Sequence, residues 1–246
     1  MATTTAVAPE AQRPINHFGR IIGALFAPRK TFEDIARQPS WIAPVLLMSI
    51  IGVGVAAMLN QRVNWGTFIR QKAEQNSRFA QLSEEQKDRA LGVQIKYAPV
   101  FSYCIGGLGT ILAVLVFALI YCGAFNLFSG AGLNYKTSLG ISAHAYLPSA
   151  IAAILMLIIL PLKGYGDVDP EHLVATNLGA FLGSDSPKWR QSLGTSLDIF
   201  WIWVLVLFAI GYSAANPRKI KTGTAFGIVF GLWAVWVLAK VSWAAI

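Results

Sequence analysis

The segment Val100–Phe128 reads VFSYCIGGLGTILAVLVFALIYCGAFNLF, and it decides the structural class of the protein. It contains no Lys, Arg, Asp, Glu or His. A helix of about 20 apolar residues is long enough to cross the hydrocarbon core of a bilayer, which is about 30 Å thick. The segment is longer than that, and it therefore predicts a membrane-spanning helix that tilts or that begins as an interfacial segment.

The rest of the chain has the same character. Of its 246 residues 55% are hydrophobic and only 13% are charged, and the mean hydropathy is +0.53. Soluble domains carry about 25% charged residues. The charges here cluster between apolar runs, which is the distribution that a bilayer imposes. The sequence predicts an all-α polytopic membrane protein with five transmembrane helices, at about residues 41–59, 100–128, 141–162, 197–215 and 223–243.

Short helices are predicted outside these spans. Residues 1–14, rich in Thr, Ala and Pro, predict a disordered tail. Apolar residues at helical spacing predict an amphipathic helix over residues 15–26 that lies in the membrane interface. A second short helix is expected to start at Thr31, the predicted N-cap, with Asp34 close to its start, and to stop at Pro39.

The polar connections also have predicted structure. In the loop of residues 60–98, Ser83 and Gln86 form a capping box, which predicts a helical hairpin or one long broken helix outside the bilayer core. We expect residues 129–139 to form a loop and Pro148 to kink the third span. Residues 172–182 predict a short amphipathic surface helix.

The charge pattern argues against nucleic-acid binding, and the cysteine spacing argues against an intramolecular disulfide. The net charge is +8 and the isoelectric point is near 9.7, but no basic block or zinc-ligand spacing accompanies them, so we expect no nucleic-acid binding. Cys104 and Cys122 lie in the same apolar run. On a helix their separation is about 27 Å, which excludes a disulfide between them.

The orientation rests on basic residues close to the membrane. The total of Lys and Arg on each side does not decide between the two orientations. The basic residues of the tail and of the Asn216 turn, however, crowd the predicted spans, whereas those of the 60–98 loop are offset by acidic residues. We therefore expect the N-terminus in the cytoplasm and the C-terminus outside.

Small residues recur at four-residue spacing on two spans. They are Gly223, Gly227 and Gly231 in the last span, and Ser102, Gly106 and Thr110 in the second. This spacing lets helix backbones approach closely. Two alternatives stay open, namely contact between helices of the same bundle, with the two rows as partners, and an oligomer face between copies.

Ionisable side chains that could carry chemistry are few. Asp167, Asp169 and Glu171 stand next to His172, but they lack the offsets of a calcium loop and are expected to begin a helix, so they are weak metal candidates. Asp198, His144 and Lys240 lie near predicted span ends, where we expect them to cap helices or to reach the interface.

Signatures of catalysis are not found in the sequence. It contains no G-x-S-x-G elbow, no H-E-x-x-H, no phosphate-binding loop and no paired aspartates in spans. The three histidines are scattered over three regions. We expect no enzyme activity, no cofactor, no bound metal and no small-molecule substrate.

Several positions together resemble the bacterial Yip1-domain proteins. The first part of the pattern consists of aromatic, Thr and Pro residues directly before and within the first span: Pro28, Thr31, Phe32, Pro39, Trp41 and Pro44. The second part lies around the fourth span and consists of Asp198, Trp203 and Gly211. The resemblance covers roughly Phe18 to the C-terminus and implies five spans. In this pattern Asp198 starts a helix.

The resemblance implies membrane organisation. Eukaryotic relatives are trafficking proteins that associate with prenylated small GTPases and with one another, and this chain lacks their long N-terminal region. The expected function is therefore a non-enzymatic membrane scaffold of the bacterial inner membrane, acting through helix, protein or lipid contacts, as a homo-oligomer or with another membrane protein. The alternatives are a subunit of a transporter or channel, and an enzyme that uses the cluster at residues 167–172.

Overall fold

The computed structural model describes residues 14–74, 77–166, 168, 174–183 and 186–245, and every described element is helical apart from one isolated bridge. In chain order the elements are α1 (His17–Phe26), α2 (Pro28–Arg37), α3 (Ile42–Arg62), α4 (Trp65–Glu74), α5 (Ser77–Ala80), α6 (Glu84–Ser129), α7 (Tyr135–Ala145), α8 (Pro148–Ile159), η1 (Leu160–Leu162), η2 (Leu178–Phe181), α9 (Lys188–Ser196), α10 (Ile199–Ala215) and α11 (Thr222–Ala245). The all-α class predicted from the sequence is confirmed for these residues.

Four helical segments are long and apolar enough to cross a membrane: α3, α6, the run Tyr135–Leu162 and α11. The fifth predicted span corresponds to α10, which has only 17 residues. Such a helix is about 26 Å long, shorter than the hydrocarbon core of a bilayer. The predicted count of five spans is therefore not exact, because four helical segments have the length of a span and the fifth, α10, is shorter.

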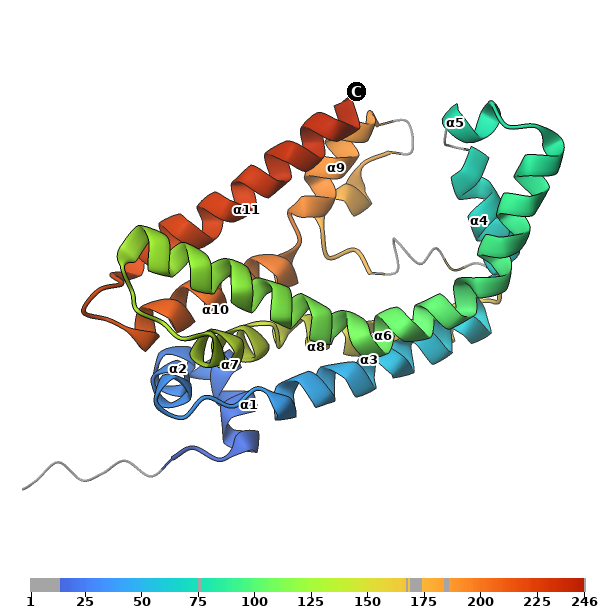
Figure 1. Ribbon diagram of the computed structural model, residues 1–246. Coiled ribbons are helices and arrows are strands. Elements are labelled where there is room, and N and C mark those ends of the chain that lie inside the picture. The colour runs from blue at the N-terminus through green and yellow to red at the C-terminus, as the bar shows by residue number, and fades with distance from the viewer. Residues whose placement is uncertain (1–13, 75–76, 167, 169–173, 184–185, 246) are drawn as a thin grey trace, which may run out of the picture.

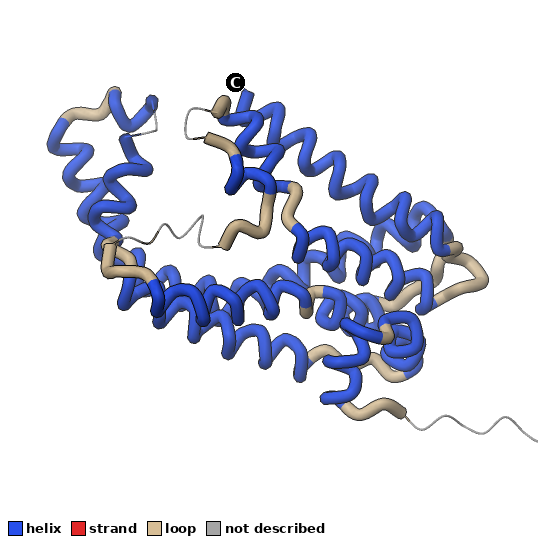
Figure 2. Tube along the Cα trace, turned by 180° about the vertical axis from the view of Figure 1, so that it is seen from behind, coloured by secondary structure: helices blue, strands red, loops and turns tan. Residues whose placement is uncertain are grey.

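The helices pack around α10. This helix contacts α2, α7, α8 and α11. In Figure 1, α3 and α6 run side by side in opposite directions, and α11 returns above α10. Figure 2 shows the same pairing of α3 and α6 from behind. Because α10 is central, nine of its 17 residues are buried, which explains how a short helix can stay in the bundle.

The bundle has two distinct ends. The N-terminal end holds α1, α2, the loop 130–134 and the turn 216–221; the loop and the turn are joined by a hydrogen bond of 2.8 Å from Asn216 Nδ2 to the carbonyl of Ala131. The opposite end, which we call the α4–α5 end, also holds α9 and the start of α6 (Figure 1). Five crossings therefore place the two termini at opposite ends.

The second span and the polar helix before it form one continuous helix. α6 has 46 residues and passes through Pro99 without a break, so the second span continues the polar helix. The helical hairpin predicted for the 60–98 loop consists of α4, α5 and the start of α6, and α4 contacts α6. The start of α6 is as predicted, because Ser83 and Gln86 form the capping box. A proline in a transmembrane helix is tolerated where neighbouring polar groups compensate for the lost amide.

The third span is broken rather than kinked. α7 begins at Tyr135 and ends at Ala145. The second half of the predicted loop 129–139 is therefore helical. α8 restarts at Pro148, which occupies the first helical turn. Proline at that position costs little, because its missing amide would have no helical partner. Residues 137–145 are all buried, which places α7 inside the bundle.

The two short helices before the first span are present with a corrected boundary. Asn16 caps α1 through the amide of Gly19, at 2.6 Å. α2 starts at Pro28 and not at Thr31, whose hydroxyl instead donates to the carbonyl of Ala27 at 3.0 Å. The prediction of Thr31 as an N-cap is therefore wrong, because the proline provides the preorganised start of the helix.

An aromatic cluster fills the core between α6 and α10. The Phe125 and Tyr212 rings stack with their centroids 4.4 Å apart, and those of Tyr121 and Phe208 lie 4.6 Å apart. The hydroxyl of Tyr212 hydrogen-bonds Ser138 of α7, whose own hydroxyl donates to a carbonyl of α6 at 2.7 Å. Aromatic pairs add about 0.5–1.5 kcal/mol each beyond area burial.

Some predictions concern residues that the structure does not describe. The predicted disordered tail lies outside the described residues except for Pro14. The predicted amphipathic helix 172–182 is described from residue 174 onward, and there only the short η2 turn is helical.

Candidate functional site

The glycine row of α11 faces outward. Gly223, Gly227 and Gly231 are exposed, and a Cβ placed on any of them would meet no other described part of the protein within 4 Å. The row continues at the same spacing with the exposed Val235 and Ala239. α11 contacts α9 and α10 through its other side. Among the described residues, the alternative that this row packs within the bundle is therefore wrong, and the oligomer face stays a prediction.

The small-residue row of α6 faces α3 instead. A Cβ on Gly52 would overlap the carbonyl oxygen of Gly106 and lie 3.0 Å from its carbonyl carbon. A Cβ on Gly106 would in turn lie 2.8 Å from the carbonyl carbon of Gly52. The two backbones therefore touch where both helices have glycine, as expected for helices packed in lipid. The sequence analysis did not identify Gly52 as a packing residue. The available signal was the series of small residues Gly52, Gly54 and Ala56 at alternate positions.

Polar groups join the same two helices near the α4–α5 end. Asn60 Nδ2 donates to Ser102 Oγ at 3.0 Å and to the Pro99 carbonyl at 3.3 Å. Trp65 Nε1 donates to Asn60 Oδ1 at 2.8 Å. Ser102 Oγ donates to the Pro99 carbonyl at 2.7 Å. These bonds join α3 to α6 at the level of Pro99.

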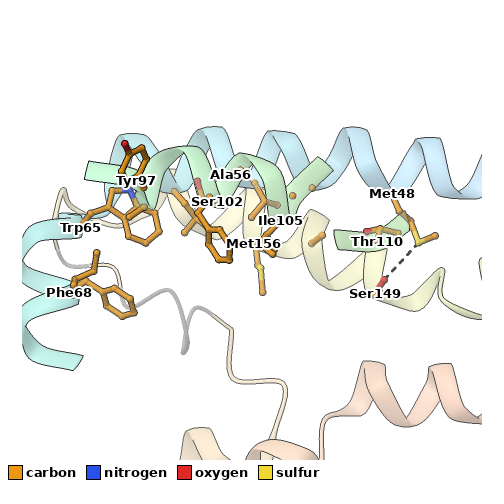
Figure 3. A pocket seen from close by; sticks show the side chains of 18 of the residues that line it. Met48, Ala56, Trp65, Phe68, Tyr97, Ser102, Ile105, Thr110, Ser149 and Met156 are labelled. Atoms are coloured by element: carbon orange, nitrogen blue, oxygen red, sulfur yellow. Dashed lines mark hydrogen bonds between the residues drawn. The ribbon is translucent and has the colours of Figure 1, made fainter. Parts of the chain in front are cut away.

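A large apolar groove opens beside this contact. We call it the α3–α6 groove; its volume is about 1200 Å³, and α3, α4, α6 and the third span line it. In Figure 3, Trp65, Phe68 and Tyr97 gather at one end and Met48, Thr110 and Ser149 at the other. Ser102, Gly106 and Thr110, predicted as a packing row, therefore line the groove as well. This site was not found from the sequence, because its walls come from four separate segments.

A buried ion pair holds the N-terminal hairpin together. Arg20 Nε of α1 lies 2.8 Å from Asp34 Oδ2 of α2, and both side chains are at most 10% exposed. Arg20 Nη1 also donates to the carbonyl of Gln38 at 2.9 Å and to Ser40 Oγ at 2.7 Å. Asp34, expected near the start of its helix, therefore serves as the partner of a buried guanidinium.

The outer face of α1 is apolar. Phe18, Ile22 and Phe26 follow each other at four-residue spacing and are 71%, 43% and 77% exposed. The exposed Arg29 and Lys30 stand shortly after them. An exposed apolar stripe beside basic residues is typical of a helix that lies in the membrane interface, as predicted.

The residues of the family pattern have architectural positions. Phe32 is fully buried against Gly211, where a Cβ would lie 3.1 Å from the Phe32 ring and 2.6 Å from Ile141. Pro39 packs on Gly140 at the N-terminal end. The remaining positions are Pro28 at the start of α2, the buried Thr31 and Pro44, the half-buried Trp203, and Trp41 before α3.

Asp198 and Lys240 act at helix ends. Asp198 Oδ1 accepts from the amide of Trp201 at 2.9 Å, so Asp198 caps α10 and its prediction as a helix-start residue is confirmed. Lys240 Nζ lies 3.2 Å from Thr195 Oγ1 and 3.4 Å from the Ser192 carbonyl, at the C-terminal end of α9. A cation there interacts favourably with the helix dipole. Lys240 therefore joins α11 to α9.

His144 is buried, contrary to the expectation that it reaches the interface. It is 1% exposed, and its Nδ1 lies 2.9 Å from the carbonyl of Gly140 in the preceding turn. Its Nε2 has no hydrogen-bond partner among the described residues. The cause is the early start of α7, which places residue 144 well inside the span.

The weak metal candidates cannot be placed. Asp167, Asp169 and Glu171, with His172 beside them, lie outside the described residues. Within the described part of the chain, no three His, Cys, Asp or Glu side chains gather as a metal site would require. Cys104 and Cys122 are both free and stand on the same helix, as predicted.

Comparison with known proteins gives one match. The family model described as the Yip1 domain matches residues 22–244. No curated protein matches the chain, and no solved structure does. The match begins within α1 and ends within α11, so it includes α2, all five crossings and every position of the sequence pattern. The protein is a multi-pass membrane protein and belongs to the Yip1 domain family.

Proposed function

We propose that this protein is a non-enzymatic membrane scaffold that works by binding a second copy of itself through the glycine face of α11. The observation that carries the proposal is the row of exposed glycines at Gly223, Gly227 and Gly231, which no described residue covers. The opposite side of α11 is already used by α9 and α10.

The chemistry of the face favours another helix as its partner. In lipid, helices associate through close packing, because the surrounding chains are as apolar as the side chains. The bundle already uses this type of contact where Gly52 meets Gly106. α11 offers three glycines in line on an outward face, and a second α11 of the same shape would place glycine against glycine. A symmetric dimer makes such a self-complementary contact.

The proposed orientation places the N-terminal end in the cytoplasm, in a bacterial inner membrane. That end exposes basic residues close to the spans: Arg29, Lys30, Arg37, Lys136, Arg218, Lys219 and Lys221. Short loops rich in Lys and Arg remain on the cytoplasmic side. A cysteine introduced at Arg218 should react with an impermeant thiol reagent only in inverted vesicles, and labelling in intact cells would reverse the orientation.

Replacing Gly227 with Leu tests the scaffold role. The new side chain would keep two α11 helices apart, and we expect self-association in nanodiscs to weaken at least about tenfold. Native mass spectrometry and crosslinking measure it. The matched control is Gly123→Leu, because Gly123 is also an exposed helical glycine without described neighbours within 4 Å. A wild-type protein that is only monomeric would refute the proposal, as would an equal loss in both variants.

A subunit of a transporter or channel is the second candidate, and His144 is the observation that favours it. Its ring stands about 14 Å along the helix from the start of α7, and an ionisable group within a membrane indicates a pathway for ions or protons. We expect that any proton flux into liposomes containing the protein disappears in His144→Phe. The absence of flux in the wild type, across a panel of ions, would eliminate this candidate.

A further inference from the structure

The α3–α6 groove is shaped by small side chains on three membrane helices. Ala56 of α3, Gly106 of α6, and Ala150 and Ala153 of α8 all line it. The backbones of α3 and α6 touch at the Gly52–Gly106 contact, and both glycines line the groove. Its volume of about 1200 Å³ exceeds the roughly 300–1000 Å³ that is usual for sites of drug-sized ligands.

The groove extends from the membrane interface into the bilayer. Trp65 and Tyr97 stand at one end, and such amphipathic aromatic residues mark the level of lipid headgroups (Figure 3). Thr110 lines the other end and belongs, like Tyr97, to the continuous helix α6. At about 1.5 Å per residue, the groove therefore extends about 20 Å along α6, which is more than one leaflet of hydrocarbon.

Two lysines stand at the interfacial end. Lys96 Nζ lies 5.5 Å from the centre of the Tyr97 ring, and Lys72 Nζ lies 5.9 Å from that of Phe68. Both rings line the groove. The acidic residue nearest to Lys96 along α6 is Asp88, about 12 Å away on the helix axis. Lys96 thus adds positive charge at the mouth of the groove, while the walls are apolar.

We propose that the α3–α6 groove binds one anionic glycerophospholipid, with its acyl chains along α3, α6 and α8 and its phosphate beside Lys96. Charge complementarity selects the headgroup, because basic residues at a membrane surface attract anionic lipid. The small residues of the walls select the chains, because they leave a continuous apolar path from the interface to Thr110. This inference extends the scaffold role, and its test is separate from that of the α11 dimer.

Native mass spectrometry of the full chain tests the inference. The protein is released from nanodiscs of phosphatidylglycerol and phosphatidylcholine at a ratio of one to four, and the retained lipid is counted per protein chain. We expect one phosphatidylglycerol to remain bound to each wild-type chain. Retention in proportion to the composition of the nanodisc would indicate surrounding lipid only and would overturn the inference.

Two pairs of variants identify the groove as the binding site. Ala153→Phe fills the groove and should lower phosphatidylglycerol retention about tenfold. Ala152→Phe, on the same helix but outside the lining residues, should retain it. Lys96→Gln should lower retention about fivefold, and Arg89→Gln, exposed on the same helix, should have no effect.

The outcomes separate the inference from the scaffold proposal. Equal retention in Ala153→Phe and wild type, or equal loss in the two alanine variants, would overturn the lipid site. Lys96 is exposed, so its replacement tests the headgroup contact without a change to the core. Gly227→Leu should still bind the lipid while it loses self-association. Loss of lipid in that variant would show that the groove depends on the dimer and not on the residues of one chain.

Discussion

Asp34→Ala is expected to lower the free energy of unfolding by about 3–5 kcal/mol and to release the α1–α2 hairpin from the bundle. The substitution leaves the Arg20 guanidinium buried at 4% exposure without the carboxylate that lies 2.8 Å from it. A buried charge that loses its partner lowers the stability by this amount, because the free-energy cost of its desolvation is no longer offset by the ion pair. Thermal unfolding in detergent measures the loss, and faster tryptic cleavage at Arg29, Lys30 and Arg37 reports detachment of the hairpin.

Two further variants separate the ion pair from general damage to α2. Glu33→Ala removes the neighbouring carboxylate, which is half-exposed and lies 3.5 Å from the exposed Arg29. Because an ion pair in solvent contributes little, we expect the free energy of unfolding to change by less than about 0.5 kcal/mol. Arg20→Met combined with Asp34→Leu removes both charges and should be far less destabilising than Asp34→Ala alone. If Asp34→Ala unfolded like Glu33→Ala, the pair would contribute nothing to the hairpin.

Gly52→Ala is expected to destabilise the protein by about 3 kcal/mol, although it adds a single methyl group. The new Cβ would overlap the backbone carbonyl of Gly106, and neither helix backbone can yield as a flexible side chain does. Overpacking typically costs about 1–3 kcal/mol, and contact with backbone favours the upper end of that range. Unfolding monitored by circular dichroism in detergent measures the change.

The control is Gly54, close by on the same helix. A Cβ on Gly54 would meet only Leu157 side-chain atoms at 3.8 Å, which is ordinary contact. Since alanine is a better helix former than glycine by about 1 kcal/mol, we expect Gly54→Ala to be neutral or slightly stabilising. Equal destabilisation by the two substitutions would contradict the close approach of α3 and α6.

The sequence predicts those features that depend on one segment at a time. The uncharged run at 100–128 gives the membrane class, the capping box gives the start of α6, and Asp198 gives the start of α10. Each of these signals is local, because a helix end needs only a cap and a span needs only length. The apolar stripe of α1 was found for the same reason.

The features that the sequence did not reveal require contacts between distant segments. Pro99 suggests a break, but α6 continues through it, and Asn60 of α3 donates to the Pro99 carbonyl across the helix pair. Asp34 suggests a helix start, yet its charge balances Arg20 of another helix. The exposure of the α11 glycines could not be predicted, because residue spacing gives the face of a helix but not the direction in which that face points.

The unbroken course of α6 has a mechanical consequence. The part from Glu84 to Ala98 precedes Pro99 and projects from the bundle toward α5 (Figure 1). At about 1.5 Å per residue this part is about 22 Å long. Because it belongs to the same helix that lines the groove, a partner bound near Glu84 would be connected directly to the α3–α6 pair, and its binding energy could be used to change the spacing of that pair.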